Sequence, residues 1–441
     1  MNKNKNRIKI LLLGSGGREH ALAWKIAQSP LCSQLYIAPG NPGTAQCGEN
    51  VPLSDSNISD IKQFVIEQVI DIVVVGPEQP LVDGIADVLK NDPLCKDVIV
   101  IGPSKKGAQL EGSKDFAKQF MHRHNIKTSD YQTFTCETVE NAYAFLEKLS
   151  PPYVLKADGL AAGKGVLICE SLSQAKSEVK EMLLEGKFGN AGNKVVIEQF
   201  LKGIELSVFV LTDGKSYLIL PSAKDYKRIG IGDTGLNTGG MGSISPVPFA
   251  DKEFMDKVEQ QIVIPTIQGL QKENIDYKGF IFIGLMNVDG NPFVIEYNIR
   301  LGDPETESIL PRIKNDLVDL FVAVGEQTLE QKKLEIIEDT VATLMLVSGG
   351  YPENYEKNKT IFHWKNISDS IVFHAGTKLN EEHVLQTSGG RVLAITSMGK
   401  DIATAVAISN KNAEKIQFEK KQYRTDIGED LITNYELKVN H

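Results

Sequence analysis

The sequence predicts an α/β protein of about three domains, the first of which is built on a parallel β-sheet. The chain has 441 residues, about the length of three average domains. In its first hundred residues, short apolar segments alternate with helical segments, as in a parallel sheet with crossover helices. A content of 41% hydrophobic and 24% charged residues is ordinary for a globular protein, so a disordered chain is not indicated.

The first element is a predicted strand at 8–13, followed by a glycine loop at 14–17 and a helix at 19–28. Glycines at such a turn let a phosphate approach backbone N–H groups at the positive end of the helix. A dinucleotide fingerprint, Gly-x-Gly-x-x-Gly, would need glycine where the chain has Glu19. The next predicted strand, 34–37, also lacks the acid that would bind a ribose. We therefore predict a Rossmann-like unit that binds a phosphate but not NAD, although a tight turn without a ligand has the same pattern.

The alternation continues with predicted helices at 58–69 and 81–89 and predicted strands at 71–75 and 98–101. Loops at the carboxyl ends of parallel strands meet at one edge of the sheet, so these loops are expected to share one pocket. Glu78 in the last of them can accept hydrogen bonds from sugar hydroxyls, or it can simply begin a helix. The first domain is expected to end near residue 104.

The second domain is predicted to begin with a helix capped by Ser113. Further on, 153–169 is predicted as a strand, a glycine-rich hairpin at 159–165 and a second strand. The hairpin can close over a triphosphate with its backbone N–H groups. It is not a Walker loop, because neither Ser nor Thr follows Lys164, whose side chain can simply be solvated. Lys156 lies in an apolar strand and is costly to bury unless it faces an anion, so we expect it to bind phosphate.

Two later segments combine polar groups with apolar strands. Residues 195–210 are predicted as strand, linker and strand, in which the linker can present backbone groups to a purine and Glu205 can reach ribose hydroxyls. Residues 224–246 hold six glycines. Long glycine loops inside compact domains are usually functional or disordered. Lys224 and Lys227 at the start of this loop favour an anionic substrate.

A row of polar residues follows a predicted strand at 279–288 and a hairpin turn at 289–291. Glu296, Asn298 and Arg300 alternate along the next strand, so their side chains are expected on one face. Burying such groups unpaired would cost roughly 1–3 kcal/mol each. Carboxylate and amide oxygens suit Mg²⁺ together with phosphate oxygens, and a guanidinium suits phosphate or carboxylate. The alternative is an edge strand with a solvated ion pair.

The rest of the composition excludes several classes of protein. The net charge is −9 with no long block of one sign, which argues against nucleic-acid binding. Five scattered cysteines without a Cys-x-x-Cys pair are typical of reduced residues in a cytosolic protein. No segment resembles a signal sequence or reaches membrane-spanning length. A final small α+β domain is predicted from about 328, with strands at 341–347, 371–374 and 392–396.

Long sequence blocks across the chain carry a specific resemblance. They are Gly14-x-Gly-Gly-Arg-Glu-His-Ala-Leu, Ala38-Pro-Gly-Asn-x-Gly-Thr-Ala, Val75-Gly-Pro-Glu, Lys156-Ala-Asp-Gly-Leu-Ala-Ala-Gly-Lys-Gly-Val, Asp225-Tyr-Lys-Arg, Asn237-Thr-Gly-Gly-Met-Gly, Arg300-x-Gly-Asp-Pro-Glu, Phe373-His-Ala-Gly-Thr and Gly389-Gly-Arg-Val-Leu. The chain resembles the ATP-grasp superfamily and, within it, the phosphoribosylamine–glycine ligase family of purine biosynthesis. The resemblance covers nearly the whole chain.

The resemblance implies three domains: a Rossmann-like domain (1–104), an ATP-grasp domain (105–327) with a mobile lid subdomain (about 126–195), and a small α+β C-terminal domain (328–441). It implies that ATP, glycine and 5-phosphoribosylamine give glycinamide ribonucleotide, ADP and phosphate through glycyl phosphate. Mg²⁺ or Mn²⁺ is the implied cofactor. The protein is expected to be a cytoplasmic monomer that binds neither nucleic acid nor a membrane.

The resemblance also assigns roles to residues. Arg300 and Lys156 are implied to be catalytic, and Glu296 and Asn298 to hold the metal. The residues implied to bind ATP are Lys114, Lys156, Gly163, Glu198, Gln199, Leu201 and Glu205. Those implied to bind the substrates are Gly16, Gly17, Arg18, Asn41, Glu78, Asp225, Lys227, Gly239, Gly240, Met241 and Arg300.

Three positions depart from the family pattern, and three other functions compete with this one. Leu301 stands where an aromatic residue is expected, Tyr226 where histidine is expected, and Leu236 where proline is expected, and these changes are expected to alter the packing around the glycine site. The competing hypotheses are another ATP-grasp ligase or carboxylase, a non-catalytic nucleotide sensor, and an NAD oxidoreductase. A sensor would be expected to lose Lys156 or Glu296, and both are present.

Overall fold

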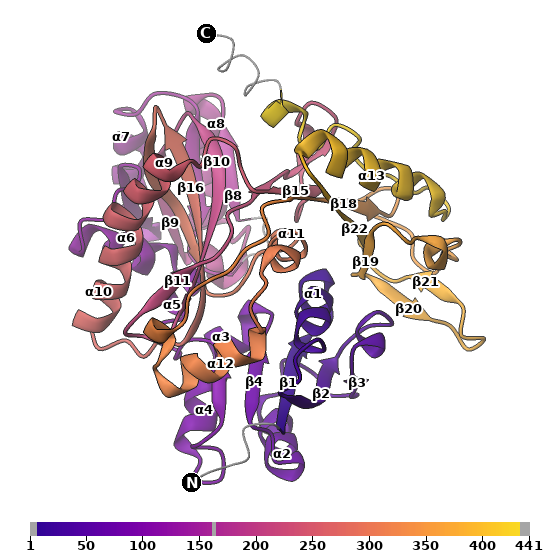
Figure 1. The fold of residues 1–441 in the computed structure, drawn as a ribbon. Helices are drawn as coiled ribbons and strands as arrows, with labels where there is room; N and C mark the ends of the chain where they lie inside the picture. The colour runs from indigo at the N-terminus through magenta and orange to yellow at the C-terminus, as the bar shows by residue number, and fades with distance from the viewer. Residues whose placement is uncertain (1–6, 161–164, 433–441) are drawn as a thin grey trace.

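The structure is a computed structural model that describes residues 7–160 and 165–432. Its N-terminal part is the predicted parallel sheet, with strand order β3-β2-β1-β4-β5 (Figure 1). The strands are β1 (Ile8–Gly14), β2 (Cys32–Pro39), β3 (Glu49–Asn50), β4 (Ile72–Val75) and β5 (Ile99–Ile101). The helices are α1 (Gly17–Ile26), α2 (Ile58–Gln68), α3 (Glu78–Asp83) and α4 (Ile85–Asn91). The loops after β1, β2 and β4 therefore lie at one edge of the sheet, as predicted.

Gly84 divides the helix predicted at 81–89 into α3 and α4. Its backbone is left-handed, with φ of +96°, a conformation that side chains with a Cβ rarely adopt. A proline also lies inside a longer helical segment. There α9 (Lys252–Val258) runs through a π turn (Glu259–Val263) into α10 (Ile264–Lys272), so the helix continues and accommodates Pro265 near the start of its last part.

A central antiparallel sheet, in the order β11-β10-β16-β17, carries Glu296 and Asn298 on its edge strand. Its strands are β10 (Ile204–Thr212), β11 (Tyr217–Ile219), β16 (Gly279–Val288) and β17 (Asn291–Asn298). The turn between β16 and β17 has positive φ at both Asp289 and Gly290, as a two-residue type I′ hairpin requires. The predicted hairpin is thus confirmed, and β17 is an edge strand.

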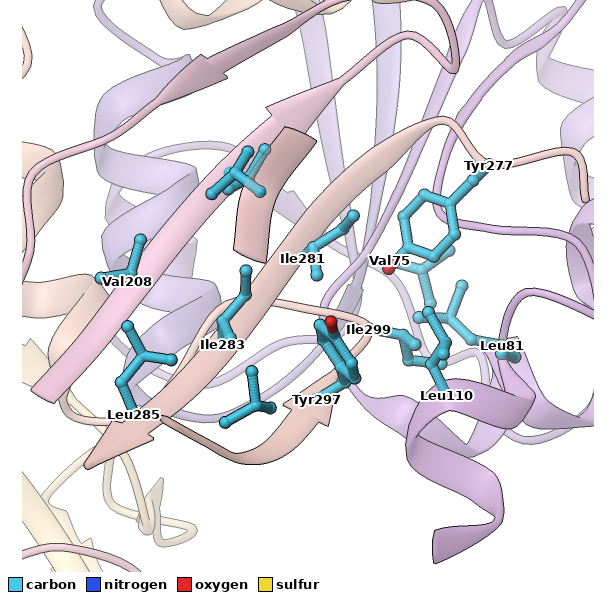
Figure 2. Packing of buried hydrophobic residues seen from close by; sticks show 14 of the residues in the cluster. Val75, Leu81, Leu110, Val208, Tyr277, Ile281, Ile283, Leu285, Tyr297 and Ile299 are labelled. Carbon is cyan, nitrogen blue, oxygen red and sulfur yellow. The ribbon is translucent and has the colours of Figure 1, made fainter. Parts of the chain in front are cut away.

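The central sheet shares a hydrophobic core with the N-terminal part of the chain. Figure 2 shows Ile281, Ile283 and Tyr297 of the sheet in the same cluster as Leu110 and Val75. Leu110 belongs to α5 (Gln109–Gly112), and α6 (Lys114–Arg123) follows with the predicted N-cap, Ser113, accepting a hydrogen bond from Phe116. This packing places α5 directly beside the carboxyl end of β17.

A third sheet, in the order β6-β9-β7-β8, has its own hydrophobic core. Its strands are β6 (Tyr131–Thr135), β7 (Tyr153–Ala157), β8 (Val166–Cys169) and β9 (Lys194–Gln199), and its helices are α7 (Val139–Leu146) and α8 (Leu172–Leu184). The strands predicted within 195–210 are β9 and β10, and they belong to different sheets. The linker between them therefore crosses from this sheet to the central one.

The last sheet, in the order β12-β15-β18-β22-β19, combines the C-terminal segment with part of the glycine loop (Figure 1). Its strands are β12 (Lys224–Asp225), β15 (Gly242–Ser245), β18 (Thr340–Val347), β19 (Ile371–His374) and β22 (Arg391–Gly399). Two hairpins flank it, β13 (Arg228–Gly230) with β14 (Thr234–Asn237), and β20 (Thr377–Leu379) with β21 (Leu385–Thr387). The remaining helices are α11 (Glu305–Ile309), α12 (Leu317–Glu326) and α13 (Ile402–Lys415).

Helix α13 is absent from the elements predicted above. Asp401 caps it by accepting a hydrogen bond from Thr404, and Ile402, Ala405, Val406 and Ser409 line its buried face. Buried residues spaced three and four apart after a capping aspartate are a sequence pattern that predicts a helix. Strands β12 and β15 come from before residue 328, so hydrogen bonding in this sheet crosses the predicted boundary between the second and third domains.

Candidate active site

Lys156 is buried on β7 and pairs with an acid of the protein. Its Nζ lies 2.9 Å from Oε1 of Glu198 and donates to the carbonyl of Ile295 at 3.0 Å. Lys118, which was not predicted, lies 2.9 Å from the other oxygen of Glu198. Burial would raise the pKa of Glu198, but the two ammonium groups bring it down to about 2. Glu198, predicted to bind ATP, therefore holds two lysines in fixed positions.

Glu296 faces several cations. Burial alone would raise its pKa, but Lys114, Lys227, Lys156 and Arg300 together lower it. Within residues 7–160 and 165–432, no group of three or more His, Cys, Asp or Glu side chains is placed to hold a metal. The site is therefore a pocket in which cations paired with acids surround Glu296, and those cations can bind phosphate groups.

Asn298 is buried, and its Nδ2 has no hydrogen-bond partner among the described residues. Buried polar atoms normally have a partner, so this unpaired N–H donor indicates a ligand that accepts hydrogen bonds, such as a phosphate. Carboxylate and amide oxygens are also the donors that Mg²⁺ and Mn²⁺ accept. The pair of Glu296 and Asn298 fits a divalent cation that takes its remaining ligands from phosphate oxygens.

Arg300 lies just beyond the end of β17 and binds two acids. Its Nη2 is 2.9 Å from Oε1 of Glu111, and its Nε is 3.3 Å from Oε2 of Glu78. Glu78 is also the first residue of α3, so it begins a helix and binds Arg300 at the same time. Glu111 was not predicted, because nothing in its local sequence marks it. The alternative prediction was an edge strand with a solvated ion pair. Strand β17 is an edge strand, but the ion pair between Arg300 and Glu111 is largely buried and not solvated.

Lys227 connects the residues predicted for ATP with those predicted for the substrate. Its Nζ lies 2.6 Å from Oε2 of Glu205 and 3.9 Å from Oδ2 of Asp225. Burial opposes the charge on Lys227, yet Asp225, Glu205 and Glu296 raise its pKa well above the usual value. Burial raises the pKa of Asp225, while the Lys227 ammonium lowers that of Glu205.

The glycine loop at Gly239 is held by two residues of the C-terminal segment. The Gly239 amide donates to the hydroxyl of Tyr351 at 2.9 Å, and its carbonyl accepts from Nη1 of Arg391 at 2.6 Å. Gly240 follows with φ of +121°, where a side chain would be strained and would contact Pro304. The buried Met241 continues the turn. Tyr351 and Arg391 were not assigned to the site by sequence, although Arg391 lies in the Gly389-Gly-Arg block.

A side-chain carboxylate of the protein, that of Glu19, binds the first glycine loop. The amide of Gly16 donates to Oε2 of Glu19 at 2.6 Å, and Nε of Arg18 donates to Oε1 at the same distance. Glu19 is the residue that breaks the dinucleotide fingerprint, and here it takes an amide that a phosphate would use. Gly17 must lack a side chain because a Cβ would lie 2.3 Å from an oxygen of Glu307.

A cavity of about 430 Å³ lies between this loop and the C-terminal segment. Its lining residues are Ser15, Gly16, Gly40, Asn41, Asp303, Tyr351, Ala375, Gly376, Thr377, Ser388 and Arg391. Arg391 is the one cation among them and lies 3.0 Å from Asp303. The Asn41 amide donates to the carbonyls of Ser15 and His374 and accepts from two backbone amides, so its side chain shapes the wall.

Of the other residues predicted to bind ATP, Gln199 ends β9 and Leu201 lies in the linker that follows. Gln199 is exposed and Leu201 is half-buried. Gly163 lies outside the described residues. Lys114 begins α6, and its Nζ is 3.5 Å from the carbonyl of Glu111, which is a long hydrogen bond. Its positive charge also lowers the pKa of Glu296.

The three departures from the family pattern lie in different surroundings. Tyr226 is buried, and its hydroxyl donates to Asp430 at 2.6 Å. Asp430 of the C-terminal segment thus satisfies the hydrogen-bonding group of the buried tyrosine. Leu301 is buried in a hydrophobic cluster while its carbonyl accepts from Arg18. Leu236 is exposed on the β14 hairpin.

Two buried histidines join the N-terminal and C-terminal parts behind the cavity. His374 donates its amide to Nδ1 of His20 at 2.7 Å, which requires that Nδ1 be unprotonated. Burial lowers the pKa of His20 to about 3 and that of His374 to about 4. An unfolded histidine has a pKa of 6.5 and takes up a proton near that pH. Both rings are still neutral in the folded protein at that pH.

We expect the two histidines to lower the stability of the folded protein as the pH falls below about 6.5. The unfolded chain then takes up a proton at each of the two histidines and the folded protein does not, which costs about 2 kcal/mol for each between pH 7.5 and pH 5.0. Urea unfolding at both pH values would measure this difference. Relative to wild type, the change in stability from pH 7.5 to pH 5.0 should be about 2 kcal/mol less unfavourable in H374F, whereas H122Q, at an exposed site, should behave as wild type. The same pH dependence in H374F and in wild type would contradict the prediction.

Comparison with known proteins decides the family. Models of the three domains of phosphoribosylglycinamide synthetase match residues 8–111 (N domain), 112–306 (ATP-grasp domain) and 341–430 (C domain). The chain belongs to the phosphoribosylglycinamide synthetase family. This confirms the resemblance drawn from the sequence blocks. No helix in the described part of the chain is long and apolar enough to cross a membrane.

Two relatives within the family match over nearly their full length. A phosphoribosylamine–glycine ligase of Yersinia pestis is 44% identical over 426 residues, which span 96% of this chain and 98% of that protein. A crystal structure of a phosphoribosylamine–glycine ligase from Thermotoga maritima has a TM-score of 0.82 at 34% identity, covering 95% of this chain and 100% of the other. A biotin carboxylase domain from Hydrogenobacter thermophilus, at 16% identity and a TM-score of 0.71 over 94% of this chain and 91% of that one, shares the fold alone.

Proposed function

We propose that this protein joins glycine to 5-phosphoribosylamine at the expense of ATP, giving glycinamide ribonucleotide, ADP and phosphate in purine biosynthesis. The observation that carries the proposal is the convergence of Lys114, Lys156, Lys227 and Arg300 on Glu296, at the end of an edge strand of an ATP-grasp domain. Such a pocket suits a nucleoside triphosphate and an anionic amino-acid carboxylate together.

The chemistry takes place in two steps. A carboxylate oxygen of glycine attacks the γ-phosphorus of ATP, the bond to the bridging oxygen breaks, and ADP leaves with glycyl phosphate formed. The amine of phosphoribosylamine then attacks the acyl carbon, loses a proton and expels inorganic phosphate. Lys156 and Lys114 neutralise the triphosphate, and Arg300 stabilises charge on the transferred phosphoryl group. No covalent enzyme intermediate is needed, so no activated cysteine or serine is required.

A divalent cation, Mg²⁺ or Mn²⁺, is part of the proposal. Glu296 and the side-chain oxygen of Asn298 would hold it, and the unpaired Nδ2 of Asn298 would donate to a phosphate oxygen of the bound nucleotide. When bound, the ion supplies a Lewis acid that neutralises phosphate charge. Glu198 has a supporting role in this arrangement, because it keeps the ammonium of Lys156 in place before the nucleotide arrives.

The nucleoside end of ATP is assigned to the linker that crosses between the two antiparallel sheets. We propose that the backbones of Gln199 and Leu201 bind adenine, that Glu205 binds the ribose, and that the hairpin containing Gly163 closes over the phosphates. Lys227 then lies between this end and the second substrate, because it already binds Glu205.

The phosphoribosyl group is assigned to the cavity beside the first glycine loop. Arg391 supplies a cation there that sequence reasoning did not assign, and Gly239, Gly240 and Met241 form the side toward the reacting groups. The amide of Gly16 is bound to Glu19, so the ligand is expected to use Arg391 more than that amide. Asn41 contributes through the shape of its loop, and Gly17, Arg18, Glu78 and Asp225 complete the surroundings.

The domain division and the cellular setting remain part of the proposal. The division is 1–104, 105–327 and 328–441, with a lid at about 126–195, and the separate hydrophobic core of the third sheet supports the lid. A cytoplasmic location agrees with five free cysteines. We also propose a monomer that binds small molecules only.

The function is tested by measuring ADP release from the purified protein with each component omitted in turn. We expect release to require glycine, phosphoribosylamine and Mg²⁺ or Mn²⁺ together, and to fall to background when any one is left out. Bicarbonate in place of glycine should not support release, which separates the ligase from a carboxylase. ADP release with bicarbonate but not glycine would overturn the proposed substrate.

A further inference from the structure

Glu111 uses each of its carboxylate oxygens for a different part of the same neighbouring segment. Oε2 accepts the backbone amide of Ile299 at 2.9 Å, and Oε1 accepts Nη2 of Arg300 at 2.9 Å. One side chain thus fixes both the backbone just before Arg300 and the far end of the Arg300 side chain. Only 4% of Glu111 is exposed, so water competes poorly for either bond.

The element that carries Glu111 is rigidly placed. Helix α5 packs on β17, and Leu110, its neighbour in sequence, belongs to the same hydrophobic cluster as Ile299 (Figure 2). The carboxylate is therefore held by the core of the protein and does not move independently of the strand. A long arginine side chain loses about 2 kcal/mol of rotamer entropy when it is fixed, and this clamp removes that cost before substrate binds.

Glu78 holds Arg300 much less firmly than Glu111 does. Its closest oxygen lies 3.3 Å from Nε, and 32% of its side chain is exposed, against 6% for the side chain of Glu111. Glu78 also lies near Arg18, which offers it a second partner. An anion that approaches Arg300 from the pocket would therefore compete with Glu78 and leave the contact with Glu111 intact.

We propose that Glu111 is a positioning residue that fixes Arg300 for phosphoryl transfer, and that Glu78 is the partner which Arg300 gives up when the anionic substrate group binds. This inference rests on the proposed function, because it assigns Arg300 to the reacting phosphoryl group. It predicts different kinetic effects for two acids that bind the same guanidinium. A purely structural role for Glu111 predicts a loss of stability and no dependence on Arg300.

The test is a double-mutant cycle of E111Q and R300A, with kcat and KM measured for ATP and phosphoribosylamine. E111Q alone should lower kcat on the order of ten- to a hundredfold with KM for ATP within about twofold, since a misplaced catalytic group costs up to about a hundredfold. In the R300A background, E111Q should lower kcat by less than about twofold. E78Q should instead remove the acid that competes with the reacting phosphoryl group for Arg300, so it should lower KM for ATP and leave kcat within about fivefold.

Two further variants keep the test decisive if E111Q folds poorly. E111D keeps the charge but shortens the reach by one methylene, so it should give a smaller loss of kcat that again disappears in the R300A background. D213N is the matched control, because Asp213 is a fully buried carboxylate that accepts backbone amides away from the site. It should lower stability and leave kcat unchanged.

Additive losses in the cycle, or an equal loss of kcat in E78Q and E111Q, would overturn the positioning role. That result would leave glycine-dependent ADP release by the wild-type protein, and so the proposed function, standing. Absence of that release in the wild type would overturn the proposed function itself.

Discussion

Replacement of Arg300 by alanine is expected to lower kcat about a thousandfold. The guanidinium would stabilise charge on the transferred phosphoryl group, and arginines in that role contribute about 10³-fold or more. Its position supports such a role, since it lies at the end of β17 close enough to Glu296 to lower the pKa of that carboxyl. The measurement is single-turnover ADP formation at saturating ATP and glycine, which reports the phosphoryl-transfer step directly.

Two comparisons make the Arg300 result interpretable. R300K keeps the charge but loses the fork that binds Glu111 and an anion together, so it should recover only part of the rate. R123A removes an exposed arginine that pairs with Glu273, and it should leave kcat unchanged. Removal of Arg300 also leaves the buried Glu111 without its ion pair, so R300A should melt at a lower temperature while remaining folded. A rate within tenfold of wild type in R300A would contradict the role.

Replacement of Glu296 by glutamine is expected to abolish most turnover while the fold is retained. The substitution keeps the size of the side chain but removes the negative charge that faces four cations and would bind the divalent ion. A lost metal contact removes several kcal/mol of charge stabilisation, which corresponds to a decrease in kcat of about a hundredfold or more.

The metal assignment has its own readout in the same variant. The concentration of Mg²⁺ or Mn²⁺ needed for half-maximal rate should rise strongly in E296Q, whereas E253Q, at an exposed position on α9, should match wild type. Circular dichroism and thermal melting should confirm that E296Q is folded. Wild-type activity and metal dependence in E296Q would remove Glu296 from the metal site.

Much of this protein could be predicted from local sequence. The alternation of apolar strands and helices determined the parallel N-terminal sheet, and Asp289 and Gly290 determined the β16–β17 hairpin, because strand burial and turn conformation depend on neighbouring residues. The row of Glu296, Asn298 and Arg300 also indicated a ligand site, since three polar groups on one strand face need a polar partner. Glu19 excluded an NAD fingerprint, and the structure shows the physical reason: its carboxylate binds the Gly16 amide.

Which polar groups meet one another was decided only by the tertiary structure. Glu78 and Glu111 lie 222 and 189 residues from Arg300 in the chain, and no local pattern connects them. The contacts of Tyr351 and Arg391 with Gly239 depend in the same way on strands β12 and β15 joining the C-terminal sheet. Periodicity reports which face of an element is buried, because burial follows from solvent exclusion along that element. It does not report the partner of a charge, because that partner is supplied by whichever distant element packs beside it.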